Sequence, residues 1–547
     1  MNHKKTQENM QKRDPGLLET LMGYVESDAY PFHMPGHKRR EIPDGVKGGF
    51  PDPYGIDITE IDGFDNLHHA EGILKDAMEE AAEIYGADRS WYLVNGSTCG
   101  ILSAVCGLTK SSGKILVARN CHKAVYHAIY LNRLETEYLY PEEIAEFGIN
   151  GGIGPEDVRA ALERDAESEP GAEVGKKRKP KIQAVLITSP TYEGVASDIR
   201  GIADAAHAYG IPLIVDEAHG AHLPFADKCR SFPKSALEYG ADVVIQSLHK
   251  TLPAFTQTAI LHVKGNLVDQ DRIARYLSMF QTSSPSYLFM AGMQRCIRYM
   301  DGDGRDEMVR YEKRLGHFME QMKELRVLKL LTVEICAAYE SAAGWDPSKI
   351  VVSTMDVNDF HGEDLAEVLR QKYHLEMEMT APEYVIAMTS LMDTEDGFER
   401  LAAALIEIDE VLADSGKRES KIADISSAGA GITEGSCEEQ KIEGMQTGEA
   451  EKKFEMQSNR GADAGKKMLI CDAMDANTRR TALQDAAGKV SAEFVYLYPP
   501  GIPIIAPGEV FTWEIVEKIV DYKAAGLLVQ GPADPAADEI LTVAEDM

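Results

Sequence analysis

An alternation of short apolar runs with helical segments, over about residues 71–300, is the feature that most constrains the fold of this chain. Runs such as Trp91–Val94, Lys114–Ala118 and Lys181–Thr188 are each followed by a polar turn and a stretch with helical spacing. Continuous β-branched runs separated by helices are typical of a parallel sheet buried on both faces. We therefore predict an α/β fold with a mostly parallel sheet and helices on both faces.

Changes in composition divide the 547 residues into five parts. The first part is rich in Pro, Gly, His and Asp, which predicts an irregular arm. Beyond residue 300, further apolar runs near 328–335, 349–357 and 384–390 predict strands, and the spacing over 361–373 predicts a helix. A polar tract without periodicity follows and predicts a flexible insert or linker, and a charged stretch at 167–181 predicts a surface loop. The predicted parts are 1–70 (N-terminal arm), 71–300 (large domain), 301–413 (small α/β domain), 414–467 (insert or linker) and 468–547 (C-terminal α/β domain).

Composition narrows the classes of partner. The chain has 57 basic and 89 acidic residues, a net charge of −32. This balance argues against nucleic acids and anionic membranes, because both require a basic surface. The eight cysteines include no Cys-x-x-Cys pair or zinc-type spacing, so we expect reduced thiols and no metal site. A polar N-terminus and the lack of an apolar run of about 20 residues predict a cytoplasmic protein without a membrane span.

Two polar segments follow the first two apolar runs of the large domain. Asn95–Gly100 immediately precedes a helix predicted at about 98–108, and free N–H groups at a helix N-terminus bind anions. Gly96 and Gly100 would let the backbone approach a phosphate. His122 follows the second run, where its ring could stack on a flat heterocycle. Taken singly, each segment is better explained as an ordinary helix start.

Two charged residues follow later apolar runs. Asp216 ends the run IPLIVD, and a carboxylate buried there requires a partner such as a protonated pyridine nitrogen. His219 and His222 nearby raise the possibility of a metal, which a lone strand-end carboxylate disfavours. Lys250 follows ADVVIQS, where burial would depress the pKa of its amine and so favour a Schiff base. Alone, Asp216 is explained by a turn cap and Lys250 by a surface position.

Together the four features predict a site for pyridoxal 5'-phosphate. They supply an anion loop, a ring-stacking side chain, a partner for the pyridine nitrogen and an amine, which are the contacts that this cofactor needs. Ligands of open α/β sheets bind at the carboxyl ends of the strands, where all four would lie. We therefore interpret the chain as an enzyme that processes amino acids.

Several uncommon strings make the chain similar to the bacterial Orn/Lys/Arg decarboxylase family. The segment around Lys250, SLHKTLPAFTQTA (Ser247–Ala259), resembles the cofactor-lysine signature of that family. The supporting strings are FHMPGHK, DITEIDGFDNLH, NGSTCG, NCHKAV, SPTYEG, DEAHGAH, QTSSPSY and YPPGIPIIAPGE. The resemblance runs from about Pro31 to Phe511 and implies the short form of the family, without an N-terminal wing domain. It also implies fold type I, with a seven-stranded type of sheet and smaller C-terminal α/β domains.

The resemblance also implies roles for residues at matching positions. Lys250 would bind the cofactor covalently, Asp216 would bond its pyridine nitrogen, and His122 would stack on its ring. His219 would lie beside the cofactor near the substrate. QTSSPSY would reach the phosphate of a neighbouring subunit, which implies a homodimer or higher homo-oligomer with shared active sites. The residues expected around the phosphate are Ser97, Thr98, Ser247 and His249, with Ser283 or Ser284 from the neighbouring subunit.

The implied reaction is decarboxylation of a basic amino acid, with Lys250, His219 or His122 returning a proton to Cα. We favour arginine as the substrate, then lysine, then ornithine. Other fold-type-I reactions, such as transamination or aldol-type cleavage, remain open, because the sequence does not locate an arginine that would clamp the substrate carboxylate. A non-catalytic regulator that binds the cofactor is the third alternative.

The polar tract at 414–467 tests this interpretation, because a solvated linker contributes nothing to the site. We expect that replacing residues 414–467 by a short Gly/Ser linker will leave CO₂ release from basic amino acids within about twofold of the full chain. Loss of activity in a folded, cofactor-loaded deletion variant would show instead that the tract is part of the enzyme.

Overall fold

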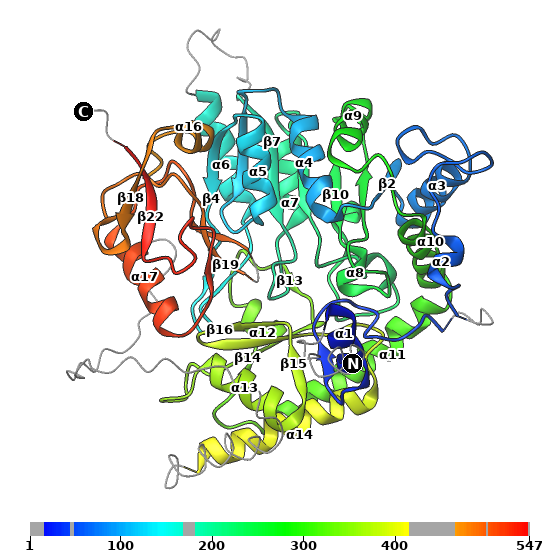
Figure 1. The fold of residues 1–547 in the computed structure, drawn as a ribbon, viewed down its shortest axis with the longest axis vertical. Helices are drawn as coiled ribbons and strands as arrows, with labels where there is room; N and C mark the ends of the chain where they lie inside the picture. Colours follow the sequence, from blue (N-terminus) through cyan, green and yellow to red (C-terminus); the bar gives the residue numbers. More distant parts are fainter. Residues whose placement is uncertain (1–15, 44–48, 168–180, 415–464, 499–500, 545–547) are drawn as a thin grey trace, which may run out of the picture.

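A seven-stranded sheet forms the centre of the molecule (Figure 1). The computed structural model describes residues 16–43, 49–167, 181–414, 465–498 and 501–544, so most of the predicted loop and insert lies outside the described residues. Every neighbouring pair of strands is parallel except the two pairs made by β11, which confirms the predicted mostly parallel sheet. In spatial order the strands are β2 (Arg89–Leu93), β11 (Ala259–Val263), β10 (Val243–Gln246), β9 (Leu213–Asp216), β7 (Ile182–Thr188), β3 (Lys114–Ala118) and β4 (Glu135–Leu139).

The order of these strands explains where a ligand can bind. From β2 to β3 and β4 the chain moves toward one edge of the sheet, and from β7 to β9 and β10 it moves back. Right-handed crossovers then place the connecting helices of the two halves on opposite faces. Accordingly, α4 (Gly96–Leu108) packs against α5 (Lys123–Leu131), and α6 (Pro155–Glu167) packs against α7 (Ile199–His207). The carboxyl ends of β3 and β7 thus flank a topological switch point, where α/β sheets bind ligands.

The N-terminal arm is more regular than predicted. It contains the helix α1 (Leu17–Glu26) and the strand β1 (Tyr30–Phe32), which pairs in parallel with β15 (Leu375–Met377). The prediction of an irregular arm was therefore wrong for residues 17–26 and 30–32, and β1 forms because a partner strand far along the chain gives this Pro-containing segment its hydrogen bonds. The arm's remaining short helices are α2 (Pro53–Ile56) and η1 (Leu67–His69), before α3 (Ile73–Tyr85).

A second, four-stranded antiparallel sheet lies beneath the central sheet in Figure 1. Its order is β12 (Lys329–Leu330), β14 (Lys349–Ser353), β17 (Tyr384–Met388) and β16 (Met379–Ala381). The strand predicted near 328–335 is only two residues long, because Thr332 caps the helix α12 (Val333–Cys336) by accepting from Ile335 N. The helices of this region are α11 (Asp303–Gln321), α13 (Gly362–Tyr373) and α14 (Glu395–Ala413), and α9 (Gln270–Phe280) and α10 (Tyr287–Asp301) precede them.

The C-terminal elements, orange to red in Figure 1, lie beside the β4 edge of the central sheet and have a small core of their own. Arg119, directly after β3, ties them to the large domain. Its guanidinium donates to Tyr126 Oη (2.9 Å), to the carbonyls of Pro503 (2.8 Å) and Ile504 (3.3 Å), and to the Glu509 carboxylate (3.0 Å). The C-terminal elements are α16 (Ile470–Asp475), β18 (Thr478–Ala482), β19 (Val495–Leu497), β20 (Pro503–Ile505), α17 (Trp513–Ala524), β21 (Val529–Gln530) and β22 (Glu539–Val543).

No helix within the described ranges is long and apolar enough to cross a bilayer.

Replacing Arg119 by Met should destabilise the docking of the C-terminal elements by about 3–5 kcal/mol, because it leaves Glu509 buried without a cation. Chemical denaturation followed by tryptophan fluorescence measures the loss. Arg133→Met is the matched control: Arg133 joins the same two regions through Asp472 (2.8 Å) and Asp475 (3.3 Å), but at an exposed position. The Arg133→Met variant should lose less than about 1 kcal/mol of unfolding free energy. Equal losses of unfolding free energy in the two variants would contradict the role of Arg119.

Candidate active site

A cavity of about 550 Å³ lies at the carboxyl ends of the central strands. The loops after β2, β3, β9 and β10 supply most of its large-domain wall. Residues from the arm, from the end of β15 and the residue after it, and from the C-terminal elements complete the lining. The predicted site residues that line it are Ser97, Thr98, His122, Asp216, His219, Ser247, His249 and Lys250.

Asp216 and Lys250 form the charged centre of the cavity. Asp216 is the last residue of β9, is 3% exposed, and accepts from Ala218 N (3.2 Å). Burial raises the pKa of the Asp216 carboxyl, and the Lys250 charge acts against that rise. Lys250 lies in the short helix α8 (Leu248–Thr251), and its Nζ is 2.8 Å from His219 Nε2. Burial lowers the pKa of Lys250 while Asp216 opposes the change, so the two strand ends hold a carboxylate and an activated amine in one cavity.

The loop after β2 and the start of α8 meet at one end of the cavity. Ser97 Oγ and Ser247 Oγ are 2.6 Å apart, although 150 residues separate them in sequence. Ser97 and Thr98 lie in the first turn of α4, where backbone N–H groups have no intrahelical acceptor. His249 donates from Nδ1 to Thr258 O (2.8 Å), and burial lowers the pKa of its imidazole to about 4. These hydroxyls and free N–H groups make a site for an anion.

His122 caps α5, where its Nδ1 accepts from Ala124 N (3.2 Å). Burial, with the charges of Lys250 and Lys123, lowers the pKa of His122 to about 3. The imidazole is therefore neutral at physiological pH and presents a flat ring to the cavity. A Cβ built on Gly501 would lie 3.6 Å from this ring, so the C-terminal elements back it closely.

Three polar atoms of cavity residues are buried without a hydrogen-bond partner among the described residues. They are Asn120 Oδ1, Thr188 Oγ1 and His219 Nδ1. Buried polar atoms are nearly always paired in folded proteins. Their convergence on one cavity fits a polar ligand that supplies both donors and acceptors.

The backbone of His219 is bound by a buried cation of the second sheet, Lys349 of β14. Lys349 Nζ donates to His219 O (2.9 Å) and to Asp346 Oδ2 (2.6 Å). His222, considered above as a metal ligand, lies 3.3 Å from the other oxygen of Asp346. His222 therefore belongs to this support and does not line the cavity.

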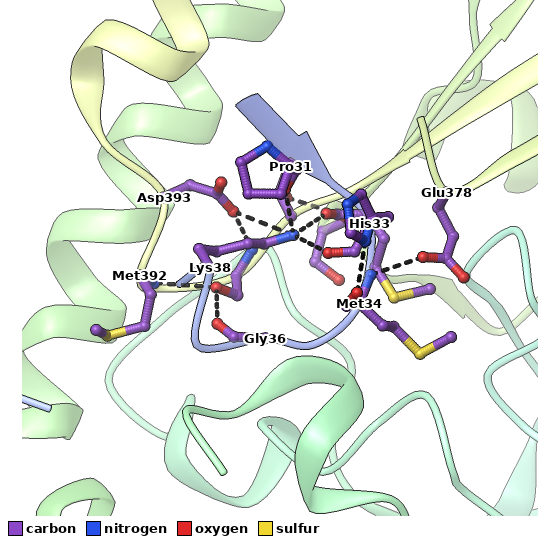
Figure 2. A network of polar contacts seen from close by, with 12 residues as sticks. Pro31, His33, Met34, Gly36, Lys38, Glu378, Met392 and Asp393 are labelled. Atoms are coloured by element: carbon purple, nitrogen blue, oxygen red, sulfur yellow. Dashed lines mark hydrogen bonds and ion pairs between the residues drawn. The ribbon is translucent and has the colours of Figure 1, made fainter. Parts of the chain in front are cut away.

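Glu378, which sequence analysis missed, lies between β15 and β16 and lines the same cavity as His219. Its Oε2 accepts from Met34 N (2.7 Å), as Figure 2 shows, and its Oε1 accepts from Tyr192 Oη (2.6 Å). The Tyr192 ring packs on the His219 ring at a centroid distance of 4.6 Å. A carboxylate is thus fixed in the cavity wall by two hydrogen bonds, and no ion pair joins it to a cation of the described residues.

Other cavity residues also escaped prediction. Glu193 is 4% exposed and accepts from Tyr384 Oη (3.2 Å), and burial raises the pKa of its carboxyl. Tyr192 and Glu193 stand in the string SPTYEG, so the resemblance marked the segment but not the residues. No sequence pattern pointed to Glu378, because it lies between β15 and β16, far along the chain from the strand ends of the central sheet. The remaining unpredicted lining includes His33, Met34, Asn120, Tyr498 and Ile502.

Ser283 and Ser284 do not line the cavity that contains the other predicted site residues. Both are exposed in the segment between α9 and α10, outside this cavity. Their predicted role concerns a neighbouring subunit and stays a prediction.

Comparisons with known proteins agree with this geometry. The family described as Orn/Lys/Arg decarboxylase, major domain, matches residues 15–362, and the corresponding C-terminal domain matches 452–525. The chain is 30% identical to an arginine decarboxylase of Bacillus subtilis, over 98% of this chain and 99% of the relative. It is 31% identical to an arginine decarboxylase of Halalkalibacterium halodurans, over 95% of each chain. The crystal structure of a Francisella novicida lysine decarboxylase aligns with a TM-score of 0.68 at 19% identity, over 87% of this chain and 72% of that one, which confirms the fold class. The chain belongs to the Orn/Lys/Arg decarboxylase family.

Proposed function

We propose that this protein is a pyridoxal-phosphate-dependent decarboxylase of a basic amino acid, with arginine favoured over lysine and lysine over ornithine. The observation that carries the proposal is the meeting of the Lys250 amine and the buried Asp216 carboxylate in one cavity at the carboxyl edge of the sheet. Membership of the family supports decarboxylation. The preference for arginine rests on the names of the relatives at about 30% identity.

The lining fits each part of pyridoxal phosphate. Ser97, Thr98, Ser247 and His249, with the first turn of α4, would surround the phosphate. The ring of His122 would stack on the pyridine, Asp216 would face the pyridine nitrogen, and Lys250 would bind the aldehyde carbon. The unpartnered polar atoms described above support a polar ligand of this size. When bound, the cofactor supplies an electron sink for the pair released from the bond between Cα and the carboxylate.

The protein's own contribution to the proton transfers follows from its electrostatics. Burial lowers the pKa of His219 well below its usual value, with Lys250 adding to the effect, so its imidazole is neutral. His122 is neutral for the same reason. We infer that Lys250 Nζ is the atom that carries the proton back to Cα, while His219 Nε2, 2.8 Å away, orients it.

Two carboxylates in the lining, those of Glu378 and Glu193, suit the cavity to a substrate with a cationic side chain. Glu378 is oriented by Met34 N and Tyr192 Oη, and Glu193 lies beside Tyr192 in sequence. A carboxylate receives a guanidinium through paired, charge-assisted hydrogen bonds. We therefore assign Glu378 to the distal end of the substrate side chain.

The proposal also includes a cytoplasmic homodimer or higher homo-oligomer with shared active sites. Ser283 and Ser284 would reach the cofactor phosphate of the neighbouring subunit. Their exposure in this chain leaves them free to do so.

Replacing Lys250 by Ala should lower CO₂ release from arginine by at least about a thousandfold, because the amine that binds the cofactor and returns the proton is gone. The absorbance of the bound cofactor in the near-visible region should be lost with it. Lys264→Ala is the control, since Lys264 also follows a strand of the central sheet, β11, but lies away from the cavity. Full activity of the Lys250 variant, or formation of a keto acid in place of CO₂ by the unmodified protein, would contradict the proposal.

Replacing Glu378 by Gln should raise KM for arginine about tenfold or more, because a buried cationic group loses its counter-charge. Steady-state kinetics with CO₂ detection measures this change. Glu376→Gln serves as the matched control: it lies two residues away, is paired with Arg370 (3.0 Å), and does not line the cavity. An unchanged KM in the Glu378 variant would remove it from substrate recognition.

A further inference from the structure

Lys38 is a buried cation in the arm that lies outside the cavity (Figure 2). Its side chain is 2% exposed. Its Nζ donates to three carbonyls, those of Pro31 (3.1 Å), His33 (2.9 Å) and Met388 (2.7 Å), and lies 3.9 Å from Asp393 Oδ2. An ammonium has three N–H donors, so every donor is used. One side chain thus joins two carbonyls of the arm to the end of β17 in the second sheet.

Asp393, the counter-charge, is itself fixed. It accepts from Tyr30 Oη (3.0 Å), at the start of the arm strand, and from Ser390 N (2.7 Å). Lys38 has φ +51°, in the left-handed region that residues other than glycine seldom adopt. The backbone therefore takes an unfavourable conformation at the residue whose side chain makes these contacts, which indicates that the contacts dictate the course of residues 33–38.

The segment fixed by Lys38 packs directly on the helix of the reactive lysine. Gly36 N donates to His249 O (2.7 Å), one residue before Lys250. A Cβ on Gly36 would lie 2.7–2.8 Å from backbone atoms of Thr251 and Leu252, so no side chain fits between the segment and α8. On its other side, Gly36 O accepts from Ser390 Oγ (2.7 Å). The segment is held between α8 and the second sheet without room to shift.

The same segment also holds the recognition carboxylate, because Met34 N donates to Glu378 Oε2. Residues 34–36 therefore bridge the helix that bears the amine and the carboxylate assigned to the distal end of the substrate. We propose that Lys38 is a positioning residue that fixes the separation of Lys250 and Glu378, and thereby the length of basic side chain that the enzyme prefers. This inference rests on the proposed function.

The test compares kcat and KM for arginine, lysine and ornithine in the unmodified protein and in Lys38→Met. We expect KM for the preferred substrate to rise about tenfold and kcat to change less than about threefold. The ratio of kcat/KM between the best and the worst of the three substrates should fall at least about fivefold. The near-visible absorbance of the bound cofactor should stay unchanged, because Lys38 does not line the cavity. Because an unpaired buried Asp393 can prevent folding, the variant Lys38→Met/Asp393→Asn is measured in parallel, with the same expected shift in preference.

Arg314→Met provides the matched control. Arg314 is a largely buried cation that donates to Leu391 O (3.0 Å) in the same loop as Asp393, but it forms no hydrogen bond or ion pair with a described residue of the arm. The Arg314→Met variant should be less stable than the unmodified protein but should keep the same ratios of kcat/KM among the three substrates. A Lys38 variant that keeps the substrate preference within about twofold, or that loses kcat with KM unchanged, would overturn the inference.

Binding of the three product amines, measured by calorimetry on the cofactor-loaded protein, separates this inference from the proposed function. If the unmodified protein releases no CO₂ from any of the three amino acids, the proposed function fails. The inference then stands if Lys38→Met reduces the differences in Kd among the three amines. It falls if these differences are unchanged.

Discussion

The opposition of a buried carboxylate and a buried amine at the ends of two adjacent parallel strands is the interaction on which the active site depends. Asp216 is the last residue of β9, Lys250 lies in α8 directly after β10, and β10 pairs in register with β9 up to Asp216. Each charge is costly to bury alone. The Lys250 charge acts to lower the pKa of Asp216, and the Asp216 charge acts to raise the pKa of Lys250, so each group favours the charged form of the other. Both line one cavity of about 550 Å³, whose wall also carries hydroxyls, imidazoles and the free N–H groups of the first turn of α4.

In the proposed assignment, the central sheet supplies the reactive end of the cavity, and the rest of the molecule supplies the end that distinguishes substrates. The arm contributes His33 and Met34, the connection between β15 and β16 contributes Glu378, and the C-terminal elements contribute Tyr498 and Ile502. These parts are held by buried cations that meet main-chain carbonyls and a carboxylate: Lys38 and Lys349 at the second sheet, and Arg119 at the C-terminal elements. A buried ion pair contributes little net stability, but any arrangement that separates the two partners leaves a buried charge uncompensated and is strongly destabilised. Fixed geometry between domains is the consequence, and recognition of a flexible basic side chain needs it.

The parts of this site that could be predicted from sequence are those whose position follows from local pattern. Asp216, Lys250, His122 and the loop containing Ser97 each follow an apolar strand, and the carboxyl ends of parallel strands meet at one edge. Glu378 and Lys38 could not be predicted in this way, because their positions depend on pairing between segments more than 340 residues apart, such as Met34 with Glu378. The same long-range pairing explains the error in the arm, where β1 gains its hydrogen bonds from β15. The antiparallel β11 was likewise not visible in the apolar pattern, since a buried strand reads the same in either direction.

The most direct measurement of the central claim is the site of covalent cofactor attachment. The purified protein, loaded with pyridoxal phosphate, is reduced with borohydride, digested and analysed by mass spectrometry. The phosphopyridoxyl group is expected on Lys250 alone. Attachment at another lysine, such as the buried Lys38 or Lys349, or the lack of any adduct on a loaded protein, would contradict the assignment of this cavity as the active site.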